Sequence, residues 1–410
     1  MYRIVLAALL LLALPVTAAD WPQWQGPDRN AISKETGLLQ TWPKGGPKLL
    51  WSINTLGDGY GTPTVSAGSI YTMGNRDGKE WIFALNETDG KERWAIEVGA
   101  VRAKGGGYAG PRCSPTVDGN LLYALGMNGD LLCVDVSRGA TAGGVLWRKD
   151  LSKDFGGKVG GWAYSESPLI DGDQVIVTPG GENTLVSLNK KTGELIWKGK
   201  VPSKDGAHYA SAVLADIHGV KQVVQFLSGG VVGIDAKDGT FLWRYNKPAN
   251  GTANCSSPIV HNNHVFAASS YGTGGGLAKI TREGQTWKAE EVYFTRQMKN
   301  HHGGMVLHDG CLYGSDEGSL TCLDFMTGKE RWAVRKGKGS ILVADNRIYY
   351  RDESGPMMLI ELSPEKCTEV GRLEQPKRSG KNTWPHPIIA NGRLYLRDQD
   401  ALYCYDVKGQ

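Results

Sequence analysis

The chain has 410 residues with 56 glycines and 13 tryptophans, and 46 basic residues nearly balance 42 acidic ones for a formal charge of +4. Its apolar and aromatic content excludes a disordered chain, and its glycines follow no three-residue period, which excludes collagen. Glycine costs about 1 kcal/mol inside a helix, so the composition predicts an all-β, turn-rich protein. The small, scattered net charge predicts no nucleic-acid partner.

The N-terminus has the layout of a secretory signal peptide over residues 1–19. Arg3 precedes the apolar run 4–14, and Pro15 is followed by small residues up to Ala19. This run is shorter than the roughly 20 residues that a membrane-spanning helix needs. We therefore expect cleavage near Ala19, a periplasmic or secreted protein and no membrane span. Residues 20–48 are expected to form an N-terminal extension that packs on the domain that follows.

A unit of about 45 residues recurs along the rest of the chain. Its mark is an apolar strand, a turn containing glycine and a short strand ending in tryptophan, as in Leu188–Trp197. Tryptophans at 94, 147, 197, 243, 287 and 332 are 53, 50, 46, 44 and 45 residues apart. Ahead of them lie strand pairs joined by short Asp-Gly or Asn-Gly turns, which are typical of hairpins. Each unit is therefore predicted to be four antiparallel strands, the blade of a β-propeller.

Eight such units account for residues 49–410 as one eight-bladed propeller of four-stranded antiparallel blades. The last unit ends at Gln410 without its fourth strand, and a strand of that kind lies alone at 48–52. Pairing this N-terminal strand with the C-terminal blade closes the ring and removes two exposed sheet edges. The repeated tryptophans are expected to pack between neighbouring blades. Their signature is weakest in the fifth and seventh units, and Trp287 is assigned to the fifth.

The seven cysteines show no spacing that suggests a metal site. Cys133, Cys322 and Cys404 occupy equivalent positions in the repeat. A position that recurs in the strands of a blade is expected to be buried. The cysteines are therefore predicted to act as small buried apolar side chains.

The turn Thr192–Trp197 and the N-terminal segment Trp21–Pro27 resemble the pyrroloquinoline quinone (PQQ) repeat, and segments 300–304 and 384–387 resemble bacterial exported PQQ-like propeller proteins. The resemblance covers essentially the whole mature chain and implies the propeller fold. Two branches share this repeat. Quinoprotein dehydrogenases hold PQQ and Ca²⁺ at the propeller axis and oxidise alcohols or sugars. The propeller lipoprotein of the outer-membrane β-barrel assembly machinery binds partners and does no chemistry, and the repeat does not separate the two.

The dehydrogenase branch implies a cofactor site. Such a site needs a cationic side chain, an aromatic floor and oxygen ligands for Ca²⁺. The candidates for these roles are Arg112 as the cation, Trp162 as the floor, and Glu166 and Asn254 as oxygen ligands. The adjacent cysteine pair that is typical of these enzymes is absent, since Cys113 stands alone, and no CxxCH haem motif occurs. A PQQ- and Ca²⁺-dependent dehydrogenase is therefore kept as the alternative. The prediction is that no cofactor is required and that no metal site is present.

With strands A to D counted from the axis outward, the D–A connections and the B–C turns of a propeller surround the mouth of its central channel. The D–A connections of this chain are rich in polar, aromatic and basic residues. Such groups, when they converge on a mouth, suit a polar, planar or anionic ligand. The side chains predicted to bind it are Tyr164, His208, Tyr209, His301, His302, Lys381, Trp384 and His386.

The preferred hypothesis is a monomeric, non-catalytic binding or scaffold module. It would hold a protein partner, or a small polar or carbohydrate ligand, at the loops around the mouth. A carbohydrate would contact aromatic rings such as Trp162 and Trp384. Most of the acidic residues of the B–C turns, a set that includes Glu353 and Asp398, are expected to be ordinary solvated hairpin residues.

Overall fold

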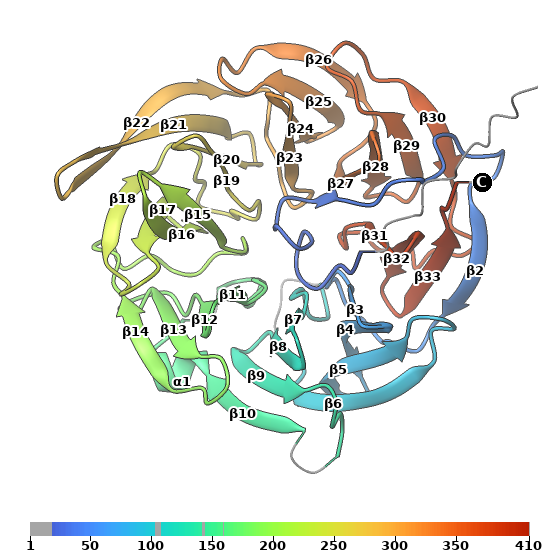
Figure 1. Cartoon of the computed structure of the whole chain (residues 1–410), viewed down its shortest axis with the longest axis horizontal. Coiled ribbons are helices and arrows are strands. Elements are labelled where there is room, and N and C mark those ends of the chain that lie inside the picture. Colours follow the sequence, from blue (N-terminus) through green and yellow to red (C-terminus); the bar gives the residue numbers. More distant parts are fainter. Residues whose placement is uncertain (1–18, 103–107, 142–143, 159, 410) are drawn as a thin grey trace, which may run out of the picture.

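The structure, a computed structural model, describes residues 19–102, 108–141, 144–158 and 160–409. The signal peptide predicted for residues 1–19 therefore lies almost entirely outside the described residues. Eight antiparallel sheets surround a central axis as the blades of a propeller (Figure 1). The predicted fold class is confirmed. In the described part of the chain, no helix is long and apolar enough to cross a membrane.

Strands run from the axis to the rim in the order A to D within each blade. The first four blades are β3 (Thr64–Ser66), β4 (Ser69–Arg76), β5 (Lys79–Asn86) and β6 (Glu92–Ala100); β7 (Thr116–Asp118), β8 (Leu121–Leu125), β9 (Asp130–Asp135) and β10 (Val145–Asp150); β11 (Leu169–Asp171), β12 (Gln174–Val177), β13 (Leu185–Asn189) and β14 (Leu195–Gly199); and β15 (Val213–Ile217), β16 (Val220–Leu227), β17 (Gly230–Asp235) and β18 (Phe241–Tyr245). A short helix, α1 (Leu151–Phe155), follows β10.

The remaining blades continue the same order. They are β19 (Ile259–His261), β20 (His264–Ser269), β21 (Gly274–Glu283) and β22 (Thr286–Thr295); β23 (Met305–His308), β24 (Cys311–Asp316), β25 (Ser319–Asp324) and β26 (Glu330–Arg335); β27 (Gly339–Ala344), β28 (Arg347–Asp352), β29 (Met357–Glu361) and β30 (Glu369–Leu373); and β31 (Ile388–Ala390), β32 (Arg393–Asp398), β33 (Ala401–Asp406) and β2 (Lys48–Ile53).

Strands from the N-terminal part of the chain close the ring. Strand β2 pairs antiparallel with β33 and supplies the D strand of the eighth blade, with Trp51 opposite Cys404. Strand β1 (Ile32–Ser33) adds to the seventh blade by pairing parallel with β27. Because both ends of the chain share one blade, the propeller leaves no gap between its first and last blades. The predicted closure is confirmed.

The repeated tryptophan and glycine lock each blade to the next. Trp147 on β10 lies opposite the small Cys133 on β9, which leaves room for the indole. The Trp147 Nε1 donates to the carbonyl of Lys190 in the next blade at 3.1 Å. Gly193 in that blade has φ 71°, and a Cβ there would lie 2.8 Å from the Trp147 ring. Glycine therefore serves both the left-handed turn and the packing of the indole.

The cysteines fit this arrangement. Cys322 lies opposite Trp332 in the sixth blade, as Cys404 lies opposite Trp51 in the eighth. All seven thiols are free, and five of them are buried. The cysteines that recur in the repeat are the small residues that accommodate a tryptophan, so their predicted role is confirmed.

The fifth blade departs from the pattern, and the assignment of Trp287 to the blade-packing position is wrong. Strands β21 and β22 form a longer hairpin, and Trp287 pairs with Arg282 near its tip. Tyr293 takes the place of the tryptophan, since its hydroxyl donates to the carbonyl of Phe325 in the next blade at 2.8 Å. The extended hairpin carries Trp287 beyond the contact that the spacing predicted.

The seventh blade also lacks its own tryptophan, and the N-terminal segment supplies one. Trp42 packs against Gly371 on β30, where a Cβ would lie 2.6 Å from the Trp42 side chain. Its ring contacts Tyr349 with centroids 5.9 Å apart, and its backbone N–H donates to the carbonyl of Val370. A residue far away in the sequence thus completes the blade.

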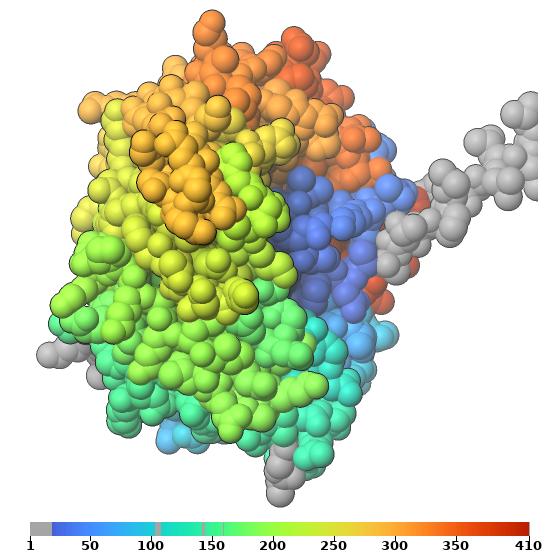
Figure 2. Space-filling view, turned by 60° about the vertical axis from the view of Figure 1, so that its left-hand side comes forward, coloured from blue at the N-terminus to red at the C-terminus, as the bar shows by residue number. Residues whose placement is uncertain are grey.

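The N-terminal segment between residue 20 and β2 covers the face formed by the A–B and C–D turns, called here the A–B face. Asp20 accepts the backbone N–H of Ala67 at 2.9 Å, and Asp345 accepts that of Leu38 at 2.8 Å. Glu35 is buried and accepts the backbone N–H of Gly392 at 2.8 Å. Figure 2 shows this segment, in blue, seated between the blades of the ring.

Part of this segment enters the central channel. Arg29 is 6% exposed and donates to the carbonyls of Ser167 and Pro168 at 2.8 and 3.1 Å. Burial lowers the pKa of Arg29 to about 10, and the Glu166 carboxylate partly opposes that shift. Trp24 donates its indole N–H to Ser257 at 3.0 Å. The channel is therefore filled from the A–B face.

Candidate functional site

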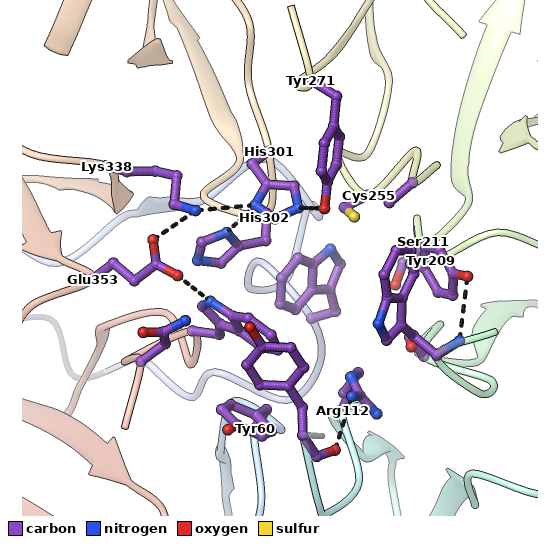
Figure 3. A pocket seen from close by; sticks show the side chains of 17 residues that line it. Tyr60, Arg112, Tyr209, Ser211, Cys255, Tyr271, His301, His302, Lys338 and Glu353 are labelled. Atoms are coloured by element: carbon purple, nitrogen blue, oxygen red, sulfur yellow. Dashed lines mark hydrogen bonds and ion pairs between the residues drawn. The ribbon is translucent and has the colours of Figure 1, made fainter. Parts of the chain in front are cut away.

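A cavity of about 280 Å³ opens on the opposite face, called here the D–A face because the D–A connections and B–C turns form it. Nine aromatic rings contribute to its wall. The residues that line it are Trp24, Tyr60, Tyr108, Arg112, Trp162, Ser165, Tyr209, Ser211, Ala253, Cys255, Tyr271, His301, His302, Lys338, Glu353, Asn382 and Trp384 (Figure 3). Trp24 belongs to the segment that fills the channel from the other face, so its indole forms the floor.

Two aromatic groups stand in the wall. Trp384, from the connection before β31, contacts Tyr60 and Tyr108 with centroids 4.6 Å apart in each case. Trp162, from the connection before β11, meets Tyr209 edge-on with centroids 5.6 Å apart. Each ring comes from a different D–A connection, so rigid blades fix their mutual positions. The cavity presents flat apolar faces to a ligand.

A polar network joins the sixth and seventh blades. Lys338 forms an ion pair with Glu353 at 2.7 Å and approaches Nδ1 of His301 at 3.4 Å. Glu353 also accepts the indole N–H of Trp384, and Nε2 of His301 lies 3.3 Å from the hydroxyl of Tyr271. A lysine only donates, so Nδ1 of His301 is the acceptor. These groups hold one another in place (Figure 3).

The histidines at the site are neutral at pH 7. Burial lowers the pKa of His301 to about 4, and the Lys338 cation acts in the same direction. Burial also lowers the pKa of His302 well below its ordinary value and that of His386 to about 4. His386 lies under the floor, on the ring of Trp24 at 4.5 Å, and its Nε2 bonds the carbonyl of His302 at 2.8 Å. These rings contribute shape and hydrogen bonds, not charge.

Arg112 brings a positive charge to the cavity. Its guanidinium donates to the backbone carbonyls of Tyr108 at 3.0 Å and Gly110 at 3.4 Å and lies 5.8 Å from the centre of the Tyr60 ring. Burial lowers its pKa from the ordinary arginine value. Among the described residues, no carboxylate forms an ion pair with it. The Lys338 charge is balanced by Glu353, whereas the Arg112 charge is not.

The structure brings together six of the twelve residues predicted from the loops: Arg112, Trp162, Tyr209, His301, His302 and Trp384. The other six do not line the cavity. His208 stacks on Tyr209 from behind, and Lys381 is exposed at the surface. Tyr164 is buried and donates to the carbonyl of Pro179 at 2.9 Å. His386 supports the floor from below.

Glu166 and Asn254 also lie outside the cavity lining, and both are satisfied by the protein. The Glu166 carboxylate accepts the Thr178 hydroxyl at 2.8 Å and the Gln225 amide at 3.2 Å, and burial raises its pKa to about 7. The Asn254 side chain accepts the N–H of Asn250 and donates to the carbonyl of Leu227. Because neither side chain lines the cavity, neither offers an oxygen to a cation there.

These residues do not fit PQQ with Ca²⁺. Calcium takes six to eight oxygens, usually including several carboxylates. Glu353 is the only carboxylate among the described lining residues, and Lys338 already pairs with it. No group of three His, Cys, Asp or Glu suited to a metal occurs in the described part of the chain. Arg112 and the aromatic rings suit an anionic ring, but the donor set for its cation is missing.

Sequence reasoning missed Trp24, Tyr60 and Lys338 and misjudged Glu353. Glu353 sits in a B–C turn but is paired inside the cavity, and Asp398 is 2% exposed with Arg378 as its partner at 3.0 Å. Both are exceptions to the expectation that most B–C acids are solvated hairpin residues, because cations from other segments cover them. Only Trp24 carried a signal, since it stands in an N-terminal motif and not in a blade.

The sequence of this chain matches a known protein family and a curated relative that bears the same name. The family model described as outer membrane protein assembly factor BamB matches residues 27–139 and 78–334. The curated BamB of Kangiella koreensis is 27% identical over 210 residues, which are 51% of this chain and 48% of that protein. The matched segment thus spans about half the length of that relative.

Two solved structures share the fold. The BamB of Moraxella catarrhalis superposes with a TM-score of 0.64 at 16% identity and covers 88% of this chain and 99% of its own. A quinohemoprotein alcohol dehydrogenase of Pseudomonas putida HK5 reaches a TM-score of 0.62 at 12% identity and covers 96% of this chain and 81% of its own. At these identities the likeness concerns the fold alone.

Proposed function

This chain belongs to the family of outer membrane protein assembly factor BamB, and from that membership we propose that it is a non-catalytic scaffold of the cell envelope. Its task would be to hold a protein partner on the loops of the D–A face. The family name connects its members with assembly at the outer membrane. The predicted signal peptide supports a place outside the cytoplasm.

The choice of face rests on one observation: the N-terminal segment covers the A–B face and leaves the D–A face exposed. The N-terminal segment occupies the A–B turns through Asp20, Glu35 and Leu38. The D–A connections carry exposed side chains such as Lys381. Loops on a rigid ring suit recognition because they vary in sequence while the blades hold them fixed. The D–A face is therefore the docking surface that we assign to the partner.

Site-specific photo-crosslinking in the intact envelope tests this proposal. A photoreactive residue at position 381 should crosslink one defined protein, identified by mass spectrometry. The matched control is position 91, in a C–D turn of the A–B face, where the lysine side chain is 83% exposed. Crosslinks from position 91 alone, or none from position 381, would contradict the proposed face.

A further inference from the structure

The cavity at the mouth has features that a protein-docking scaffold does not need. Its volume of about 280 Å³ lies near the lower end of small-molecule sites, roughly 300–1,000 Å³. Trp24 closes its floor, so a ligand enters from the D–A face and cannot pass through the ring. A space of this size accommodates a ligand of one ring.

The walls define the shape of that ring. Trp384 with Tyr60 and Tyr108 forms one aromatic group, and Trp162 with Tyr209 forms another. The negative faces of aromatic rings attract the weakly positive C–H groups of an apolar ring face. A pyranose has such faces, and its hydroxyls project around the edge.

Polar groups distributed around the cavity match hydroxyls at the ring edge. The Asn382 amide lines the cavity and has no hydrogen-bond partner among the described residues. Tyr271 is 51% exposed, and its hydroxyl lies beside His301. An amide both donates and accepts, as does a hydroxyl. A flat aromatic ligand without hydroxyls would leave the Asn382 amide without a partner in the cavity.

The charge defines the remaining substituent. Arg112 is half-buried and has no carboxylate partner in the described part of the chain, whereas Lys338 is neutralised by Glu353. The Arg112 side chain stands apart from Lys338 and Glu353 in the wall (Figure 3). A guanidinium recognises a carboxylate through two parallel hydrogen bonds. We therefore expect the ligand to carry one anionic group, placed next to Arg112.

We propose that the cavity is a binding site for a sugar acid: a single pyranose ring that stacks on the aromatic walls and places its carboxylate on Arg112. This site goes beyond the proposed docking function and does not depend on it. A uronate is the simplest ligand with these features. Binding needs no cation and no chemical step.

Titration calorimetry with galacturonate, glucose and benzoate tests the proposal on the mature chain. Galacturonate should bind saturably, and glucose and benzoate should each bind at least about tenfold more weakly. Glucose that binds as tightly as galacturonate would overturn the role of the carboxylate. Benzoate that binds as tightly would overturn the sugar, and absence of saturable heat with galacturonate would overturn the site.

Variants locate the site. Arg112→Met should weaken galacturonate binding by about tenfold or more, and Arg112→Lys should restore part of it because the charge remains. Lys91→Met, on the A–B face, should bind like the wild type. Melting temperatures measured alongside exclude loss of fold, and unchanged binding by a folded Arg112→Met would contradict the assignment. Crosslinking at position 381 reports on the protein partner independently.

Discussion

The two faces of the ring are built from the same repeat, but one is covered by the chain itself and the other carries an open cavity. On the A–B face, glycine turns, tryptophans and the N-terminal segment satisfy one another. Glu35 is buried there and Arg29 is buried in the channel that the same segment fills, and the backbone supplies the partners of both. On the D–A face, a half-buried Arg112 lines an open cavity beside rings such as Trp384. Chemically similar residues are therefore structural on one face and available to a ligand on the other.

This difference teaches that residue type alone does not indicate function in a propeller. Both faces contain tryptophan, arginine and acidic residues. What distinguishes them is whether the polar and apolar surfaces of those residues are already occupied. Substitutions at matched positions on the two faces should therefore differ in their cost to the free energy of unfolding.

The largest difference is expected between two tryptophans. Trp197 is 6% exposed and bonds the carbonyl of Ala236 in the next blade at 3.1 Å, so Trp197→Ala should cost about 3–5 kcal/mol of unfolding free energy. Trp162 is half-buried in the cavity wall, so Trp162→Ala should cost about 1 kcal/mol. Denaturant unfolding measures both, and equal costs would contradict the comparison.

The buried histidine under the floor makes stability depend on pH. The pKa of His386 is about 4 in the folded chain and about 6.5 when unfolded. The unfolded state therefore takes up the proton first, and the His386 ring alone should lower the free energy of unfolding by about 3 kcal/mol as the pH drops from 6.5 to 4. Unfolding measured between these pH values should show a smaller fall for His386→Asn.

The control for this measurement is a variant that is destabilised without losing a titrating group. Gly193→Ala meets this condition. Its stability should fall with pH as steeply as that of the wild type. If His386→Asn showed the wild-type slope, the His386 ring would contribute nothing to the acid sensitivity.

Two arginines compare the channel filled by the N-terminal segment with the open cavity of the D–A face. Arg29 donates to two carbonyls in the channel, and Arg29→Met leaves those acceptors unpaired, so it should cost about 2–3 kcal/mol. Arg112→Met at the open cavity should cost at most about 1 kcal/mol. Thermal unfolding of the pair checks this, and a larger loss for Arg112→Met would make Arg112 a structural residue.

The smallest effect separates turn geometry from packing. Gly193 and Gly172 both have positive φ, 71° and 57°, so alanine costs about 1–2 kcal/mol at either position. At Gly193 the new Cβ would also lie 2.8 Å from the Trp147 ring, whereas at Gly172 nothing lies within 4 Å. Gly193→Ala should therefore be the more destabilising by about 1 kcal/mol. Equal denaturation midpoints would show that the indole moves away without cost.

The site was predictable in part. Trp162, Tyr209, His301 and Trp384 were identifiable because they stand in D–A connections, and propeller geometry directs those connections to one mouth. Glu166 also comes from a D–A connection, yet its carboxylate turns to Thr178 and Gln225. The sequence position of a loop residue indicates its face of the ring but not the direction of its side chain.

The sequence by itself determined the number of blades, the closure of the ring and the role of the repeated glycine, tryptophan and cysteine, because these depend on contacts between adjacent units. Only the tertiary structure decided that Trp24 closes the cavity, that Trp42 completes the seventh blade and that Lys338 pairs with Glu353. These contacts depend on how loops and the N-terminal segment fold over the ring. The repeating sequence pattern does not reveal these contacts, because each of them occurs only once in the molecule.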